Sequence, residues 1–327
     1  MPTGLLERLI SRDRGRSQRG NIDWLTVLED CLDDAETVSL LRQIPSAERR
    51  ALLAETGREV YRRDLGNFAA ELSYNTDFVI ASGQLPDFGE QREDHAACLF
   101  AGLSDAVDFL TRASGEEHLA ATRVDVQGLS HLQPFPQRRG VLLLSVFQSH
   151  IGYMAPLLET LGKVALIRKP QGSEGRDYFP QRLLEWRAAL EVVPADAAGG
   201  MRLFQILRNR GVVGLYNDFL YPDARAVRGL LFGRHVPISR TLLLMIRKTG
   251  AVVIPTAIAR RLPVEGNEVQ VCFFPPLPAS LAPEEATETA LAIQLSLATE
   301  CLIRRFPAQW RLWNTLRLRW ERGEELP

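Results

Sequence analysis

His150 is the residue of this sequence best placed to do chemistry. It follows the continuous apolar run 141–147 and lies in the short segment Ser149-His150-Ile151-Gly152. A neutral imidazole can take a proton from a hydroxyl, amine or thiol near neutral pH. An isolated histidine more often caps or packs a turn, so the elements around His150 decide its role.

The elements that position His150 alternate between strand-like and helix-like segments beyond Gly140. The run 141–147 is predicted to be a strand buried on both faces, because its apolar residues are continuous. The later segments predict helices over 151–161, 179–190, 201–210, 239–249 and 283–305, and strands over 164–168, 191–194, 212–217, 251–259 and 269–274. Strands separated by helices predict an α/β fold with a mostly parallel central sheet flanked by helices. In such sheets the chemistry lies at the carboxyl ends of strands, where His150 falls.

The first third of the chain is helical in character. Apolar residues recur at helical spacing, as in Trp24 and Leu28 or in Leu99 and Leu103, while the segment 82–90 is predicted to be a loop. We therefore expect three parts: a flexible N-terminus (1–20), a helical N-terminal region (21–135) and an α/β core (136–327).

Composition excludes several classes of protein. The 327 residues are 46% hydrophobic and 24% charged with a net charge of -1, so no basic field attracts nucleic acid. The four cysteines are far apart and lack a C-x-x-C spacing, which predicts buried thiols in a reducing cytoplasm. The longest apolar run is much shorter than the roughly 20 residues that span a bilayer. We expect a cytoplasmic protein with no transmembrane segment, nucleic-acid partner, metal or cofactor.

Four blocks of the sequence, taken in order, resemble the lysophospholipid acyltransferase superfamily, and in particular its lipid A lauroyl/myristoyl acyltransferase branch. The first block is the apolar strand with His150-Ile151-Gly152, which is similar to that branch's His-x-Gly-Asn-Trp-Glu. The other blocks are 211–218, Leu231-Phe232-Gly233 with Thr249-Gly250 and Pro255, and Pro307-Ala308-Gln309-Trp310 with Trp313. The resemblance implies that His150 is the general base on an acceptor hydroxyl, which attacks an acyl thioester on coenzyme A or a carrier protein.

The sequence departs from that family at the acidic partner of the histidine. The family places an acid five positions after the histidine to orient the imidazole, and this chain has Ala155 there. Asp218, at a predicted strand end, is our first choice for a replacement, and Glu159, one helical turn beyond Ala155, is the second. Two alternatives remain: His150 works without a carboxylate, or the chain is a non-catalytic relative.

Other residues are candidates for binding. Ser149, Gly152 and Tyr153 flank His150 and are predicted to contact substrate. Arg225 and Arg228 lie in a long loop predicted from Asp218 to Pro237, and Arg240 follows shortly after it, near the same predicted edge of the sheet. Guanidinium groups there can bind phosphate or sulfate through paired hydrogen bonds. The phosphopantetheine arm of a carrier protein is the natural candidate, although a solvated basic loop is the alternative.

The resemblance therefore implies an acyltransferase-fold enzyme, but without the N-terminal membrane helix and the acid of the lipid A branch. We predict a soluble, repurposed enzyme that acts on an acyl or aminoacyl intermediate bound to a carrier protein, in bacterial specialised-metabolite biosynthesis. One alternative is intramolecular displacement, such as aziridine ring closure with loss of sulfate or phosphate. Another is a non-catalytic binding subunit that works with a partner subunit.

Overall fold

A computed structural model describes most of the chain. The described residues are 22–135, 138–148, 151–160, 164–168, 190–194, 196–218, 226–283 and 285–324. The predicted flexible N-terminus, 1–20, and most of the helix predicted over 179–190 lie outside these ranges.

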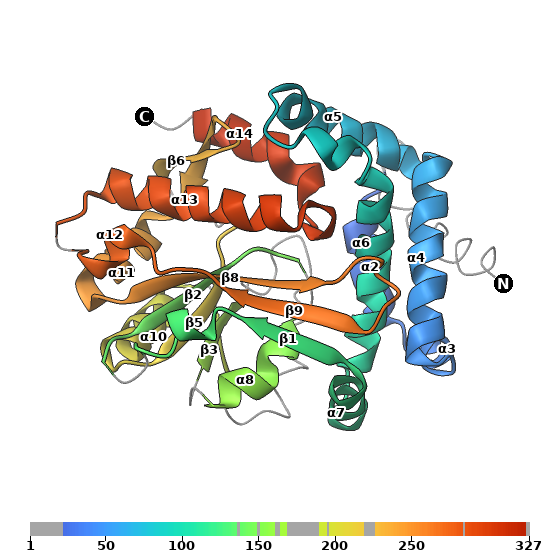
Figure 1. Cartoon of the computed structure of the whole chain (residues 1–327), viewed down its shortest axis with the longest axis horizontal. Coiled ribbons are helices and arrows are strands. Elements are labelled where there is room, and N and C mark those ends of the chain that lie inside the picture. Colours follow the sequence, from blue (N-terminus) through green and yellow to red (C-terminus); the bar gives the residue numbers. More distant parts are fainter. Residues whose placement is uncertain are drawn as a thin grey trace.

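A seven-stranded sheet forms the centre of the molecule, with strand order β1-β9-β8-β2-β5-β3-β4 (Figure 1). Every neighbouring pair is parallel except β8 and β9, which are antiparallel. The strands are β1 (Arg123–Gln127), β2 (Val141–Ser145), β3 (Val164–Arg168), β4 (Leu190–Pro194), β5 (Val212–Tyr216), β8 (Val252–Arg260) and β9 (Glu268–Phe273). The predicted mostly parallel α/β sheet is confirmed.

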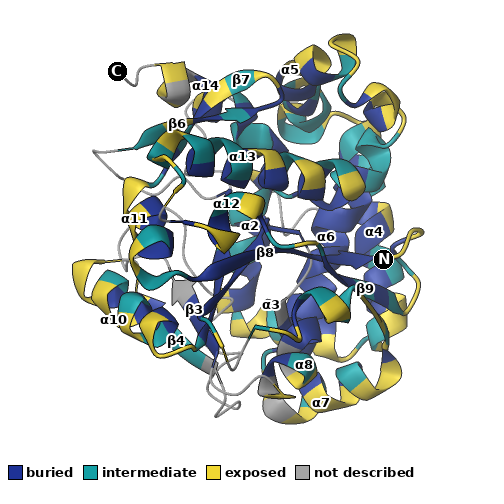
Figure 2. Cartoon of the chain, turned by 60° about the vertical axis from the view of Figure 1, so that its left-hand side comes forward, coloured by how far each residue is buried: buried dark blue, intermediate teal, exposed yellow. Residues whose placement is uncertain are grey.

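Strand β2 is buried on both faces, as its continuous apolar sequence predicts. Leu142 and Leu144 join one hydrophobic cluster, and Val141 and Leu143 join another on the opposite face. Helices α10 (Ala197–Arg208), α11 (Arg240–Thr249) and α13 (Glu288–Arg305) cover the first face, and η5 (Ile151–Met154) with α8 (Ala155–Thr160) packs on the second. Figure 2 shows β8 buried and exposed residues on the outer sides of α10, α11 and α13.

The N-terminal region is helical, as predicted, and stands beside the β1–β9 end of the sheet in Figure 1. Helices α4 (Ser46–Arg62) and α6 (Arg92–Asp108) can pack closely because Gly57 has no side chain. A Cβ there would lie 2.3 Å from the carbonyl oxygen of Ala96. Three of the other helices begin at side-chain caps, for example at Asp34, which accepts a hydrogen bond from the backbone N–H of Thr37. The helices are α2 (Trp24–Asp30), α3 (Ala35–Arg42), α4 (Ser46–Arg62), α5 (Phe68–Ala81), α6 (Arg92–Asp108) and α7 (Arg112–Ala121).

Three local predictions were wrong. The region after Asp218, predicted to be a long loop, contains an antiparallel hairpin of β6 (Val227–Leu231) and β7 (Arg234–Ile238). The loop predicted over 82–90 contains a 3-10 helix, η3 (Pro86–Gly89), and the helix predicted from 283 begins only at Glu288, after the separate α12 (Pro278–Leu281).

The cysteines also differ from the prediction in one case. Cys31, Cys98 and Cys272 are buried, but Cys301 on α13 is exposed. No disulfide links them.

The C-terminal segment closes over one end of the sheet. It consists of η6 (Pro307–Gln309), η7 (Trp313–Thr315) and α14 (Leu316–Glu324). The rings of Trp310 and Trp313 are fully buried and meet edge to face with centroids 4.6 Å apart, which is a favourable aromatic geometry. Within the described part of the chain, no helix has the length and apolar character needed to cross a bilayer.

Candidate functional site

The carboxyl ends of β2 and β5 carry the sequence-predicted site, but His150 itself lies outside the described residues, as do Ser149 and Arg225. Gln148 is the last described residue before His150, and Ile151 is the first after it. The environment of the histidine is therefore described from residues 138–148 and 151–160, on either side of it.

Asp218 lies two residues beyond the end of β5 and is buried, with 3% of its surface exposed. Its Oδ2 accepts hydrogen bonds from the backbone N–H of Phe147 at 2.7 Å and from the indole N–H of Trp310 at 2.7 Å. Its Oδ1 is buried and has no hydrogen-bond partner among the described residues. Asp218 thus connects the end of β5 to the segment that leads from β2 to His150.

Burial raises the pKa of the Asp218 carboxyl, because the charged form loses its hydration. The positive charge of Arg319 opposes that rise, as do the hydrogen bonds from Phe147 and Trp310. The carboxylate is therefore held in place by N–H donors while one of its oxygens keeps its capacity to accept a proton or a hydrogen bond.

The segment after β2 is fixed from three directions. Asp218 binds the N–H of Phe147, the carbonyl of Phe147 accepts from the backbone N–H of Arg311 at 3.0 Å, and Gln148 donates from Nε2 to the carbonyl of Leu302 at 3.1 Å. Gln148 is 1% exposed, and its Oε1 has no hydrogen-bond partner in the described structure. Two polar oxygens at this edge of the sheet, one on Asp218 and one on Gln148, are therefore buried without donors among the described residues.

Gly152 and Tyr153 follow His150 on η5, and both are buried. The hydroxyl of Tyr153 is hydrogen-bonded to Nε2 of His118 at 2.7 Å and accepts a hydrogen bond from Arg260. His118 in turn lies 3.1 Å from a carboxylate oxygen of Asp108. Tyr153 is thus anchored to the N-terminal helices, and its contact with substrate stays a prediction.

A buried ionic cluster surrounds Tyr153. Asp105 receives two hydrogen bonds from Arg260, at 2.7 and 3.1 Å, and lies 3.7 Å from Nε of Arg50. Burial alone would raise the pKa of Asp105, but the guanidinium groups of Arg260 and Arg50 lower it well below its usual range. Asp105 is therefore ionised at neutral pH. The cluster joins α4, α6 and β8 to the segment after His150.

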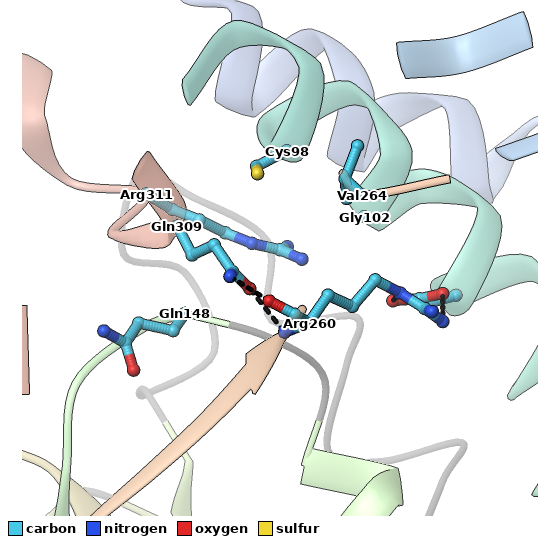
Figure 3. A pocket seen from close by; sticks show the side chains of 8 residues that line it. Cys98, Gly102, Gln148, Arg260, Val264, Gln309 and Arg311 are labelled. Atoms are coloured by element: carbon cyan, nitrogen blue, oxygen red, sulfur yellow. Dashed lines mark hydrogen bonds and ion pairs between the residues drawn. The ribbon is translucent and has the colours of Figure 1, made fainter. Parts of the chain in front are cut away.

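A small cavity of about 10 Å³ lies between this cluster and the end of β2, which is room for about one water molecule. Figure 3 shows Gln309 bonded to the backbone of Arg260 and Arg311 extending towards Gly102 on α6. A Cβ on Gly102 would lie 2.2 Å from Nη2 of Arg311, so glycine makes room for the guanidinium. Gln148 also lines this cavity.

Comparison with known protein families shows the family to which the chain is related. Residues 106–321 match the model of the bacterial lipid A biosynthesis acyltransferases, a range that includes β2, β5, Asp218 and the segment around Trp310. The chain belongs to this acyltransferase family. None of the curated proteins compared with the chain matches it.

The lipid A acyltransferase relationship draws attention to Ala155, because the resemblance places the acidic partner of the histidine at this position. Ala155 begins α8, where the resemblance places the acid, and the side chain of Glu159 on the same helix is not among those described. Asp218 is the buried carboxylate joined to the segment before His150. Its role as the partner of His150 stays a prediction.

Two of the predicted anion-binding arginines are described. Arg240 pairs with Glu288 at 2.8 Å on an exposed surface, and Arg228 is exposed on β6, opposite Pro237 of β7. Their role in binding phosphate stays a prediction, but Arg240 already has a carboxylate partner.

Sequence reasoning missed the residues of the ionic cluster beside the candidate site. Asp105 and Arg260 are separated by 155 positions, and neither lies in a block that resembles the family. Arg311 could have been predicted, because it follows Gln309 and Trp310 in the last of those blocks. Within the described ranges, no group of three or more potential metal ligands occurs.

Proposed function

We propose that this chain is an acyltransferase-fold enzyme of the bacterial cytoplasm, in which His150 is the general base. It acts on an acyl or aminoacyl group carried as a thioester on a carrier protein, in specialised-metabolite biosynthesis. His150 removes the proton of the acceptor hydroxyl, the acceptor oxygen forms a bond to the thioester carbon, the carbon–sulfur bond breaks, and the thiolate takes up a proton.

One observation carries the proposal beyond family membership. Asp218 is a buried carboxylate whose Oδ2 holds the N–H of Phe147, three residues before His150, and whose Oδ1 has no donor among the described residues. It is the described carboxylate best connected to the histidine segment in a chain whose usual acidic position is Ala155. A carboxylate of this kind can orient an imidazole and stabilise its charged form.

The proposal is tested by intact-mass spectrometry of a carrier protein loaded with acyl or aminoacyl groups. The wild-type protein is expected to remove the acyl mass from the carrier and deliver it to an acceptor. His150→Ala is expected to lower that rate by about 10³-fold or more, because the base is lost. An unchanged melting temperature of the variant shows that it is folded.

The same experiment separates the alternatives. Loss of sulfate or phosphate mass from the loaded carrier, with no acyl transfer, supports displacement and contradicts the proposal. A rate that His150→Ala leaves unchanged removes the histidine from the chemistry, and no mass change with any loaded carrier favours a binding subunit.

A further inference from the structure

A second and larger pocket opens beyond the small cavity at the site. Its volume is about 430 Å³, within the range of roughly 300–1,000 Å³ that is usual for small-molecule sites. Four parts of the chain form it: η3 with the residues on either side, the end of β8 with the turn that follows, Gln270 of β9, and the end of α13 with η6.

Basic side chains dominate the polar part of this pocket. Arg261 pairs with Glu268 at 3.1 Å on an exposed surface, and Arg304 pairs with Glu300 at 2.6 Å. Arg305 is exposed and lies over the ring of Phe306, 5.5 Å from its centroid. A guanidinium has five N–H donors, so one carboxylate partner does not saturate Arg261, whereas Arg304 also donates to the backbone carbonyl and the side-chain oxygen of Gln84.

The charge of the lining favours an anion. Asp87 is the carboxylate that lines the pocket together with these arginines. The pair of Arg261 and Glu268 is exposed, 67% and 37% by side chain, and such pairs contribute little to stability. A bound anion can therefore share the Arg261 guanidinium at small cost.

The rest of the pocket is apolar. Leu85 and Phe88 are buried, Phe306 is half-buried, and Leu262 is 42% exposed. Leu262 and Phe306 keep accessible apolar surface, which a bound inorganic ion would leave in contact with water. A ligand that combines an anionic group with an apolar chain covers both parts of the lining.

Gln309 and Arg260 separate the pocket from the inner cavity, since both residues line both spaces. Gln309 holds the backbone of Arg260 through two hydrogen bonds. On the inner side of this wall lies Gln148, whose buried Oε1 has no donor among the described residues. The pocket is therefore next to the polar interior that reaches the end of β2.

We infer that this pocket binds an organic phosphate or sulfate ester, with the ester group on Arg305 and Arg261 and the apolar chain on Leu262 and Phe306. Arginine suits tetrahedral oxyanions because its planar N–H groups make paired hydrogen bonds to them. The inference does not depend on acyl transfer, because binding is measured without turnover.

Isothermal titration calorimetry of the full chain tests this inference with hexyl phosphate and hexyl sulfate. We expect wild-type protein to bind at least one ester, the tighter one identifying the anion, and to bind inorganic phosphate and 1-hexanol more weakly. Arg305→Gln is expected to weaken ester binding about tenfold, because a charge-assisted contact is lost. Affinity is also expected to fall as salt is raised.

Arg63→Gln is the matched control, because it removes an exposed arginine next to α4 that lies outside the pocket. Its affinity for the esters is expected to equal that of the wild type. Absence of ester binding, equal binding by Arg305→Gln, or equal binding of 1-hexanol would overturn the inference. None of these results depends on His150, so a failed transfer assay leaves this test intact.

Discussion

At the scale of single residues, the two carboxylate oxygens of Asp218 have different surroundings. One of its oxygens ties the end of β2 to the end of β5 and to Trp310, and the other has no donor in the described structure. Burial raises its pKa, so ionisation of this carboxylate costs the native state more than it costs the unfolded chain.

This cost predicts a pH dependence of stability. The native pKa of Asp218 lies above the unfolded value of about 3.9, so below both values the group is protonated in both states. As pH rises, the unfolded chain ionises first and is stabilised relative to the native state. The amide introduced by Asp218→Asn keeps an acceptor oxygen but cannot ionise. The free energy of unfolding of wild type minus that of Asp218→Asn is therefore expected to fall as pH rises above about 4, as measured by urea denaturation.

The opposite trend, a difference that grows with pH, would contradict a raised pKa at Asp218. The comparison with Asp218→Asn removes the contributions of all other titrating groups, because they occur in both proteins. Stability rather than activity is measured, so the role of His150 does not enter.

At the scale of elements, the close contact between α4 and α6 sets a strict size limit at Gly57. A Cβ there would meet the carbonyl of Ala96 on the neighbouring helix at 2.3 Å, and backbone atoms cannot rotate away. Gly57→Ala is expected to destabilise the protein by about 1–3 kcal/mol through overpacking. Gly200→Ala on α10, where a Cβ has no neighbour within 4 Å, is expected to be neutral or slightly stabilising, since alanine favours helix.

Chemical denaturation of both variants measures this difference. If Gly57→Ala proves as stable as Gly200→Ala, then α4 and α6 do not approach as closely as described.

The sequence predicts best the strands that are buried on both faces, because their apolar residues form a continuous run. The strands around 141–147, 164–168 and 212–217 were predicted because apolar runs mark strands covered on both faces. The β6–β7 hairpin was missed because its turn is Phe232-Gly233, with positive φ at both residues, rather than an Asn-Gly or Asp-Gly pair. Strand β1 was missed because it is mostly exposed and so has no continuous apolar run.

The candidate site also has one part that the sequence predicts and one part that it does not. Asp218 could be predicted because it follows a recognisable strand at the functional edge of the sheet. The ionic cluster could not, because Asp105 and Arg260 meet only when the helical region docks against β8. Contacts of this range depend on tertiary packing, which leaves no local pattern in the sequence.

At the scale of the whole molecule, the ionic cluster joins the helical region to the sheet. Asp105 on α6 pairs with Arg260 on β8, and Arg50 on α4 donates to the carbonyl of Gly266 before β9. His95 on α6 is hydrogen-bonded to the carbonyl of Ala308 at 2.9 Å. We therefore expect helical region and sheet to unfold together.

Asp105→Asn tests this coupling. The substitution leaves Arg260 and Arg50 buried without their shared carboxylate, which is expected to cost about 3–5 kcal/mol of unfolding free energy. Glu288→Gln, which breaks the exposed pair with Arg240, is expected to cost about 1 kcal/mol or less. Urea titrations followed by tryptophan fluorescence and circular dichroism are expected to coincide for the wild type. Two separate transitions would show that the regions unfold independently.

The exposed thiol of Cys301 allows the protein to be labelled at one position. The other three thiols are at most 9% exposed, so a maleimide dye has one accessible attachment point on the native chain. Cys301 lies one helical turn before Arg305, at the end of α13 that borders the 430 Å³ pocket. A fluorophore at this position places an optical reporter beside the pocket, with no substitution needed to install it.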